Sequence, residues 1–464
     1  MTDFVALLQP DRGQPAHPIH LIDKNSIAEW LKRQPAARRA LLKAVNFDGK
    51  NAGKFAILPG AGDAYEVVAA VADAEALTPW CLARLGESLD TGNYRLESGT
   101  PGAAALGWLL GQHRFTRYKS DDTPERGPRV LLTADVAGID RTVRLAQATA
   151  EVRDLVDTPA ADMGPADLEA AARALAADHG AALTVTAGDA LEQGYPMIAA
   201  VGQGATRERA PRLIELNWGN PKHPRVAIIG KGVCFDSGGL DIKPASGMRL
   251  MKKDMGGAAH ALVLARLVMA ERLPVRLHLL IPAVENSVSA AAFRPGDIIA
   301  SRKGLSVEID NTDAEGRLVL GDALTRAGEE EPELILDFAT LTGAARVALG
   351  PDLPALFAND DGLAAALEAA SKAAHDPLWR MPLWDGYDEM LKSDVADLAN
   401  AADSPLAGAV TAALFLRRFV PEGTTWAHFD TFAWRPSPKP GRPKGGEAMG
   451  LRAAFAMLSD RYGV

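Results

Sequence analysis

The chain has 464 residues, of which 47% are hydrophobic and 23% are charged, and its formal net charge is -9. This composition is that of a globular protein, and no apolar run approaches the roughly 18 residues that a membrane-spanning helix needs. The acidic balance argues against a general affinity for nucleic acid or for an anionic membrane. Two cysteines, Cys81 and Cys234, cannot build a disulfide framework, and no basic region precedes the short N-terminal apolar run. A cytoplasmic protein without a secretory signal is therefore expected.

The length favours two domains, and residues 1–150 have the pattern of a smaller N-terminal α/β domain. Short apolar runs such as 55–58 predict strands, and an alanine-rich stretch around 103–112 predicts a helix. This part of the sequence contains no catalytic cluster, and we expect it to serve oligomerisation or regulation. A helical pattern over 140–157 predicts the connector to a second domain, residues 151–464.

Short apolar segments alternate with helical patterns beyond this connector. We predict strands at 183–185, 198–201, 213–216, 226–229, 277–281 and 334–338. Such nearly continuous apolar runs are typical of strands that are buried on both faces. The second domain is therefore predicted to be of the α/β class, with a mostly parallel central sheet flanked by helices.

Charged residues follow the predicted strand 226–229. They are Lys231, Asp236, Lys243 and Asp254. Each has an ordinary alternative role, because a lone lysine is usually solvated, Asp-Ser-Gly-Gly favours a turn, and an aspartate before a helix often caps it. A metal-bound lysine amine would have to be neutral, so the metal would displace its proton.

A second acidic segment, Asn311-Thr312-Asp313-Ala314-Glu315-Gly316-Arg317-Leu318, lies between a predicted strand and a predicted helix. The strand is indicated by alternating apolar residues at 305–309, and the helix by apolar residues recurring from Leu320 to Ala327. A loop in this position can present a site at the carboxyl ends of the strands of an α/β domain.

Four carboxylates stand out in these two regions, from Asp236, Asp254, Asp313 and Glu315. If they converged without a cation they would repel one another, and some would stay protonated. Two divalent metal ions would balance four negative charges. The set as a whole therefore predicts a two-metal hydrolytic centre, although each acid taken alone could be a solvated loop residue.

The same segments resemble the leucyl aminopeptidase family of cytosolic two-metal exopeptidases. The resemblance covers roughly residues 150–464 and is carried by segments that agree in order and spacing: Gly230-Lys231-Gly232, Phe235-Asp236-Ser237-Gly238-Gly239, Ile242-Lys243-Pro244, Asp254-Met255-Gly256-Gly257-Ala258-Ala259, Asn311–Leu318 and Ala339-Thr340-Leu341-Thr342-Gly343-Ala344. It implies that the second domain is catalytic and removes the N-terminal residue of peptides, through a water that bridges two metals.

The resemblance also implies roles for individual residues. One metal would be bound by Lys231, Asp236, Asp254 and Glu315, and the other by Asp236, Asp313 and Glu315. Carboxylate ligands suit zinc, manganese or magnesium. Arg317 would hold a bicarbonate that accepts the proton of the water, and Lys243 would stabilise the developing oxyanion.

Substrate-binding positions are implied in the same way: Met251, Asn311, Thr340, Gly343 and Phe432. Phe432 stands in His428-Phe429-Asp430-Thr431-Phe432-Ala433-Trp434, where the family usually has a small residue that lines the pocket for the first side chain. A bulky ring there can narrow or reshape the pocket, so the resemblance does not carry over a preference for leucine. The family further implies a homohexamer acting on peptides with a free N-terminus.

Two alternatives remain open from the sequence. The first is a DNA-binding architectural role, which the net charge and the intact set of acids disfavour. The second is a two-metal phosphoesterase, since the same pair of metals can activate water against a phosphate ester.

Overall fold

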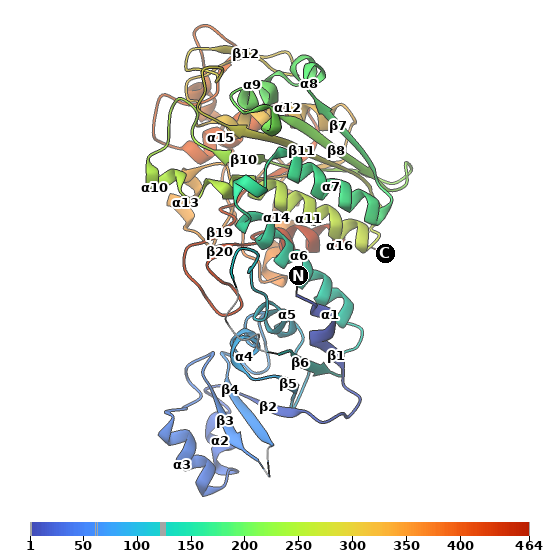
Figure 1. The fold of residues 1–464 in the computed structure, drawn as a ribbon, viewed down its shortest axis with the longest axis vertical. Coiled ribbons are helices and arrows are strands. Elements are labelled where there is room, and N and C mark those ends of the chain that lie inside the picture. Colours follow the sequence, from blue (N-terminus) through green and yellow to red (C-terminus); the bar gives the residue numbers. More distant parts are fainter. Residues whose placement is uncertain (1, 61, 63, 121–126, 464) are drawn as a thin grey trace. The chain divides into compact units, whose positions relative to one another are not determined.

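The computed structural model describes residues 2–60, 62, 64–120 and 127–463, and the chain folds as two units (Figure 1). The first unit holds Met1–Ala150 together with Ser437–Lys444, and the second holds Glu151–Pro436 together with Gly445–Val464. The boundary falls inside helix α6, Ile139–Asp157, the helix that the sequence predicts as a connector. The proline-rich segment Ser437–Lys444 is thus part of the first unit.

The first unit contains a six-stranded sheet in the order β1-β6-β5-β2-β4-β3. Its strands are β1 (Leu8–Pro10), β2 (His17–Ile22), β3 (Phe55–Pro59), β4 (Tyr65–Ala70), β5 (Gly92–Leu96) and β6 (Arg129–Thr133). All neighbouring strands run parallel except β3 and β4. The helices of this unit are α1 (Phe4–Leu7), α2 (Ile27–Lys32), α3 (Ala36–Ala44), α4 (Ala83–Ser88) and α5 (Ala104–Leu110). The predicted N-terminal α/β class is confirmed.

The second unit is built on a nine-stranded sheet in the order β16-β15-β18-β14-β9-β11-β8-β7, with β10 also paired to β11. The strands are β7 (Ala182–Ala187), β8 (Arg212–Trp218), β9 (Arg225–Gly230), β10 (Gly232–Asp236), β11 (Arg276–Asn286), β14 (Leu334–Ala339), β15 (Ala355–Ala358), β16 (Trp379–Arg380) and β18 (Thr425–Asp430). The pairs β9/β11, β9/β14, β14/β18, β10/β11 and β15/β16 are parallel, whereas β7/β8, β8/β11 and β15/β18 are antiparallel. A mostly parallel sheet is therefore confirmed.

Helices cover both faces of this sheet (Figure 1). One face carries α7 (Pro165–His179), α11 (Gly256–Ala270) and α16 (Leu451–Tyr462), and the other carries α9 (Pro196–Gly202), α12 (Glu315–Gly328) and α15 (Gly408–Arg417). Every residue of β9 and of β14 is buried, which explains their nearly continuous apolar sequences. The remaining helices of this unit are α8 (Asp189–Gly194), α10 (Ala245–Met248), α13 (Gly343–Leu349) and α14 (Asp361–Ala373).

The strand predicted at 198–201 is wrong, because these residues belong to helix α9. Pro196 occupies a first-turn position, where a missing backbone N–H costs nothing. The Asp322 carboxylate accepts hydrogen bonds from the N–H groups of Met197, at 2.9 Å, and Ile198, at 3.3 Å, so it satisfies the start of the helix from another element. A short apolar run does not by itself distinguish a strand from a buried helix.

The carboxyl ends of the central strands meet at one edge of the sheet. Gly230, the last residue of β9, is level with Phe338 of β14, and Ala339 of β14 is level with Asp430 of β18. On the other side Asp236 of β10 is level with Asn286 of β11. Residues that follow these strands are thus brought together, as expected for an α/β sheet.

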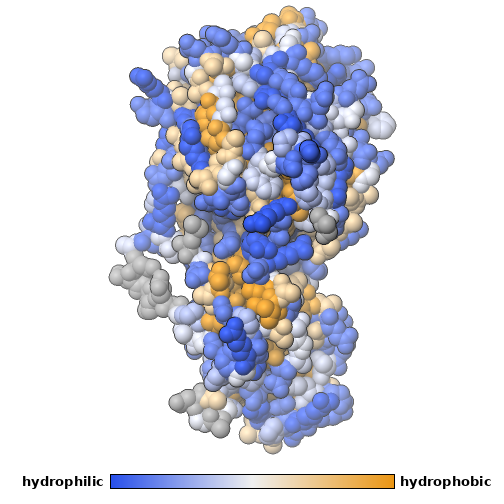
Figure 2. Space-filling model, turned by 90° about the vertical axis from the view of Figure 1, so that its right-hand side faces the viewer, coloured by the Kyte–Doolittle hydropathy of each residue, from blue (hydrophilic) through white to orange (hydrophobic). Residues whose placement is uncertain are grey.

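Among the described residues, no helix combines the length and the apolar character that crossing a membrane requires. Hydrophilic residues cover most of the molecular face shown in Figure 2, with hydrophobic residues in smaller groups between them.

Candidate active site

Lys231 lies directly after β9 and is almost completely buried, with its side chain 3% exposed. Its Nζ is 2.7 Å from Asp254 Oδ2 and 2.8 Å from Glu315 Oε1, and it donates to the carbonyl oxygen of Thr340 at 3.2 Å. Burial alone would lower the pKa of this amine, but the two acids outweigh it and raise the pKa. Lys231 is therefore held by charge in the middle of the predicted cluster.

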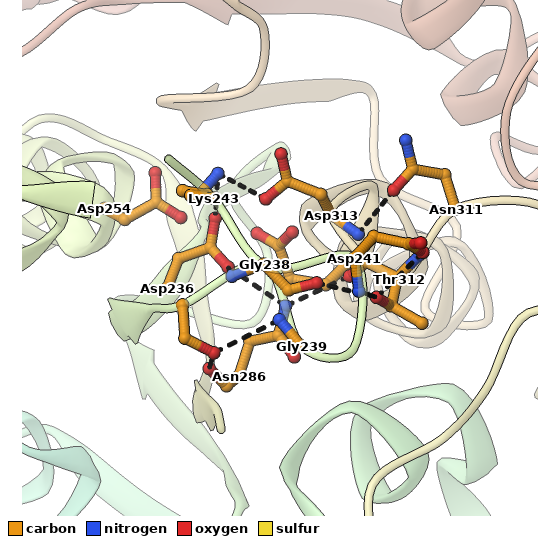
Figure 3. A network of polar contacts seen from close by, with 12 residues as sticks. Asp236, Gly238, Gly239, Asp241, Lys243, Asp254, Asn286, Asn311, Thr312 and Asp313 are labelled. Carbon is orange, nitrogen blue, oxygen red and sulfur yellow. Dashed lines mark hydrogen bonds and ion pairs between the residues drawn. The ribbon is translucent and has the colours of Figure 1, made fainter. Parts of the chain in front are cut away.

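Asp236 ends β10, and both of its carboxylate oxygens have partners (Figure 3). Oδ1 accepts from Asn286 Nδ2 and from the N–H of Gly238, each at 2.9 Å. Oδ2 is 2.7 Å from the Nζ of Lys243, which also pairs with Asp313. The chain can turn here because Gly238 has a φ of +87°, a left-handed conformation that favours glycine.

The loop that carries Asp313 is fixed by its own backbone and by neighbouring side chains (Figure 3). Thr312 donates its N–H to Asp241 Oδ2 at 2.7 Å and its hydroxyl to the carbonyl oxygen of Gly238 at 2.6 Å. Asn311 Oδ1 accepts the N–H of Asp313 at 2.8 Å. These bonds join the two acidic loops, so Asp236 and Asp313 are positioned together.

Asp254 does not cap helix α11, although an aspartate before a helix often has that role. It lies in a 3-10 turn, Met251–Met255, that precedes the helix, and its Oδ1 accepts a hydrogen bond from the hydroxyl of Thr340 at 2.7 Å. Because Thr340 follows β14, this bond ties the turn to the edge of the central sheet.

The carboxylate oxygens of this cluster are suited to binding divalent cations. Single carboxylate oxygens of Asp236, Asp313 and Glu315 all lie within 4.8 Å of one another. The buried oxygens Asp254 Oδ2, Asp313 Oδ1 and Glu315 Oε1 accept no well-aligned hydrogen bond, and lysine Nζ atoms are their ionic neighbours. Burial and the nearby Asp236 raise the pKa of Asp313 to about 6 and that of Glu315 to about 8. Acids crowded in this way favour added positive charge.

A cavity of about 380 Å³ opens onto this cluster. Its lining includes ten of the twelve predicted site residues: Lys231, Asp236, Lys243, Met251, Asp254, Asp313, Glu315, Thr340, Gly343 and Phe432. The structure therefore brings these residues together around one space.

The two other predicted residues, Asn311 and Arg317, lie outside this lining. Asn311 shapes the loop through the hydrogen bond to Asp313. Arg317 is buried, its Nη1 donates to the carbonyl oxygen of Asn400 at 2.7 Å, and its Nε has no partner among the described residues. Burial lowers the pKa of this guanidinium to about 10.

Three further polar residues of the site were not identified from the sequence. Asn286 lies at the end of β11 and donates to both Asp236 Oδ1, at 2.9 Å, and the carbonyl oxygen of Thr312, at 3.0 Å. Its place after a long apolar run was a signal that could have identified it. Lys253 and Arg346 also line the cavity, and both cationic groups lie over the Phe432 ring, at 5.2 Å and 4.8 Å from its centre. Burial lowers the pKa of Lys253 to about 8.

Comparison with known proteins agrees with this arrangement over nearly the whole chain. The description "Cytosol aminopeptidase family, catalytic domain" matches residues 150–455, and "M17 aminopeptidase, N-terminal domain" matches residues 17–128. A protein of Syntrophotalea carbinolica named "Probable cytosol aminopeptidase" is 42% identical over 370 residues, which are 76% of this chain and 74% of that protein. A protein of Roseiflexus castenholzii with the same name is 44% identical over 77% of this chain and 76% of its own length.

Solved structures are also similar to this chain over nearly its full length. The crystal structure of cytosol aminopeptidase from Coxiella burnetii has 45% sequence identity, covers 98% of this chain and 99% of its own, and superposes with a TM-score of 0.92. The bottromycin maturation enzyme BotP, in a complex with manganese, has 32% identity, covers 97% of this chain and 100% of its own, and has a TM-score of 0.86. The chain therefore belongs to the cytosol aminopeptidase (M17) family, and it is an aminopeptidase, a hydrolase of peptide bonds.

Proposed function

We propose that this aminopeptidase uses two divalent metal ions, held by Lys231, Asp236, Asp254, Asp313 and Glu315. The observation that carries the proposal is the group of buried carboxylate oxygens with no aligned hydrogen bond beside the cavity. Zinc, manganese and magnesium all suit oxygen ligands, and manganese is the metal in the BotP complex. When bound, the two ions would polarise the scissile carbonyl group and acidify a water molecule.

The residues around these ligands have distinct roles in the proposal. Lys243 contacts Asp236 and Asp313 and lines the cavity, so its ammonium group can stabilise negative charge on the carbonyl oxygen of the substrate. The buried and only partly bonded guanidinium of Arg317 suits the capture of a small anion, and we assign bicarbonate to it. An anion held there would supply a proton acceptor for the water, since no histidine is among the described residues that line the cavity.

The remaining predictions from the sequence are part of the same proposal. Met251, Thr340, Gly343 and Phe432 line the cavity and would surround the first side chain of the peptide, while Asn311 would act through the loop that it shapes. A homohexamer in the cytoplasm, with the first unit serving assembly or regulation, remains our prediction from the resemblance. For the alternatives of a phosphoesterase and a DNA-binding architectural protein, no observation in the described part of the chain speaks in their favour.

Metal content and hydrolysis test the proposal together. The variant Glu315→Ala should bind fewer metal ions by elemental analysis and should lose hydrolysis of aminoacyl anilides with zinc or manganese supplied. Asp361→Ala is a matched control, because it removes a carboxylate that is 91% exposed and outside the cavity. Full activity of Glu315→Ala after removal of metal would disprove the two-metal mechanism, and cleavage of aryl phosphate in place of the anilide would favour the phosphoesterase.

A further inference from the structure

The cations that line the cavity fall into two groups. Lys231 and Lys243 each contact two carboxylates at ion-pair distance. Lys253 has one distant ionic neighbour, Asp254 Oδ1 at 3.8 Å, and Arg346 has no carboxylate partner among the described residues. The second group thus carries positive charge that the protein does not neutralise.

The nearby acids are already engaged. Asp254 Oδ1 accepts the Thr340 hydroxyl at 2.7 Å, and Oδ2 is 2.7 Å from Lys231. Asp430, another carboxylate of the cavity lining, accepts the N–H of Leu341 at 3.0 Å and the N–H and hydroxyl of Thr342 at 3.2 Å and 2.6 Å. Neither acid is available to neutralise the second group of cations.

Burial makes the charge of Lys253 energetically unfavourable as long as no anionic ligand is bound. The side chain of Lys253 is only 5% exposed, and a buried ammonium group without a close counter-ion loses more hydration energy than it recovers. The ring of Phe432 offers both cations its electron-rich face, but such a contact is weak and leaves the charge in place. A carboxylate that enters the cavity would supply the missing negative charge.

We propose that Lys253 and Arg346 form a subsite for the side chain of an N-terminal glutamate or aspartate, so that the enzyme prefers peptides with an acidic first residue. The position follows from the neighbours of the two cations. Lys253 directly precedes the ligand Asp254, and Phe432, over which both cations lie, occupies the pocket proposed for the first side chain. This inference rests on the proposed function and names its substrate class.

Glutamate and glutamine substrates give the sharpest test, because the two side chains have the same shape and differ in charge. We expect kcat/KM for glutamyl anilide to exceed that for glutaminyl anilide by about 10- to 100-fold, the range of one or two charge-assisted hydrogen bonds. In the variant Lys253→Met/Arg346→Met this ratio should fall close to one. Lys252→Met removes the same charge one residue earlier, outside the cavity lining, and should keep the wild-type ratio.

The outcomes separate the inference from the proposed function. Equal or faster hydrolysis of the glutaminyl and leucyl anilides by the wild type, or a ratio unchanged in the double variant, would overturn the subsite. So would faster cleavage of Ala-Glu-Ala than of Glu-Ala-Ala, which would place the acidic preference at the second residue. Absence of hydrolysis of every substrate with zinc and with manganese would instead overturn the proposed function.

A binding measurement covers the case in which the double variant does not fold. Free L-glutamate should bind wild-type enzyme more tightly than L-glutamine by calorimetry, by about tenfold or more. Equal binding of the two amino acids would overturn the subsite without any use of the variants.

Discussion

Gly316 is the residue whose replacement tests most directly how Lys231 is held. A Cβ at this position would lie 2.6 Å from both Cε and Nζ of Lys231 and 2.8 Å from its Cδ. Ordinary carbon contacts are about 3.5–4.0 Å, so the end of the lysine would have to move by about 1 Å in Gly316→Ala. A free lysine could move easily, but this Nζ is bound to Asp254, Glu315 and the carbonyl oxygen of Thr340.

The expected loss is therefore in activity more than in stability. A displacement of about 1 Å at a reacting centre can cost about 100-fold in rate. Crowding in the core costs about 1–3 kcal/mol, and alanine in a helix recovers up to about 1 kcal/mol relative to glycine, so Gly316→Ala should stay folded. We expect kcat/KM to fall about 100-fold while the urea unfolding midpoint changes little.

A matched control is Gly194→Ala, also within a helix, where the nearest neighbour of the new Cβ is Arg302 Nη1 at 3.5 Å, an ordinary contact. This control should keep its activity. If Gly316→Ala retained kcat/KM within about threefold of wild type with an unchanged metal content, then the position of Lys231 would not matter for catalysis, and the reasoning would be refuted.

Three other predictions test the site and the first unit. Thr340→Val removes the hydroxyl that donates to Asp254 Oδ1 and should weaken metal binding about 10- to 100-fold in a metal titration, while a wild-type affinity would show that this bond does not orient the ligand. Removal of divalent metal by a chelator should abolish hydrolysis, and zinc or manganese should restore it; activity that persists would contradict metal dependence. Backbone N–H groups of Ala74 and Ser26 lower the pKa of Asp23 to about 2, so its contribution to stability is present above the unfolded pKa near 3.8 and is lost as the pH falls through about 2. Asp23→Asn should destabilise the first unit at pH 7 by about 1–2 kcal/mol in urea unfolding, with a difference from wild type that shrinks between pH 4 and pH 2; a constant difference would contradict this origin.

The sequence predicted most of the fold because the signals are local. Fully buried strands such as β9 and β14 read as continuous apolar runs, and their alternation with helical patterns indicates a parallel sheet without knowledge of any contact. The strand predicted at 198–201 is wrong because the contacts that decide its structure are not local. The bonds that make it the helix α9 come from Asp322, more than a hundred residues away, and no local pattern reports them.

The residues of the candidate site likewise divide into those that local motifs indicate and those that only long-range contacts define. Lys231, Asp236, Asp254, Asp313 and Glu315 are polar residues within motifs, and the sequence alone marked them as a set. Asn286, which orients Asp236, was harder to find, because its hydrogen bonds to Asp236 and to Thr312 join segments that are distant in the sequence. Lys253 and Arg346 could not be linked from the sequence, because it is the packing of both against Phe432 that makes them one feature.

Strand register is the step that turns separate motifs into one site. The N–H of Lys231 donates to the carbonyl oxygen of Phe338 at 2.9 Å, and the carbonyl oxygen of Lys231 accepts the N–H of Ala258 at 2.8 Å, so this residue is joined by its backbone to β14 on one side and to α11 on the other. Gly257 permits this approach, since a Cβ there would lie 2.1 Å from the carbonyl oxygen of Phe338. A slip of one residue between β9 and β14 would turn the Lys231 side chain to the opposite face of the sheet. The pairing of these buried strands therefore places the backbone of Lys231 at this edge of the sheet, and the ion pairs with Asp254 and Glu315 hold its amine among the acids.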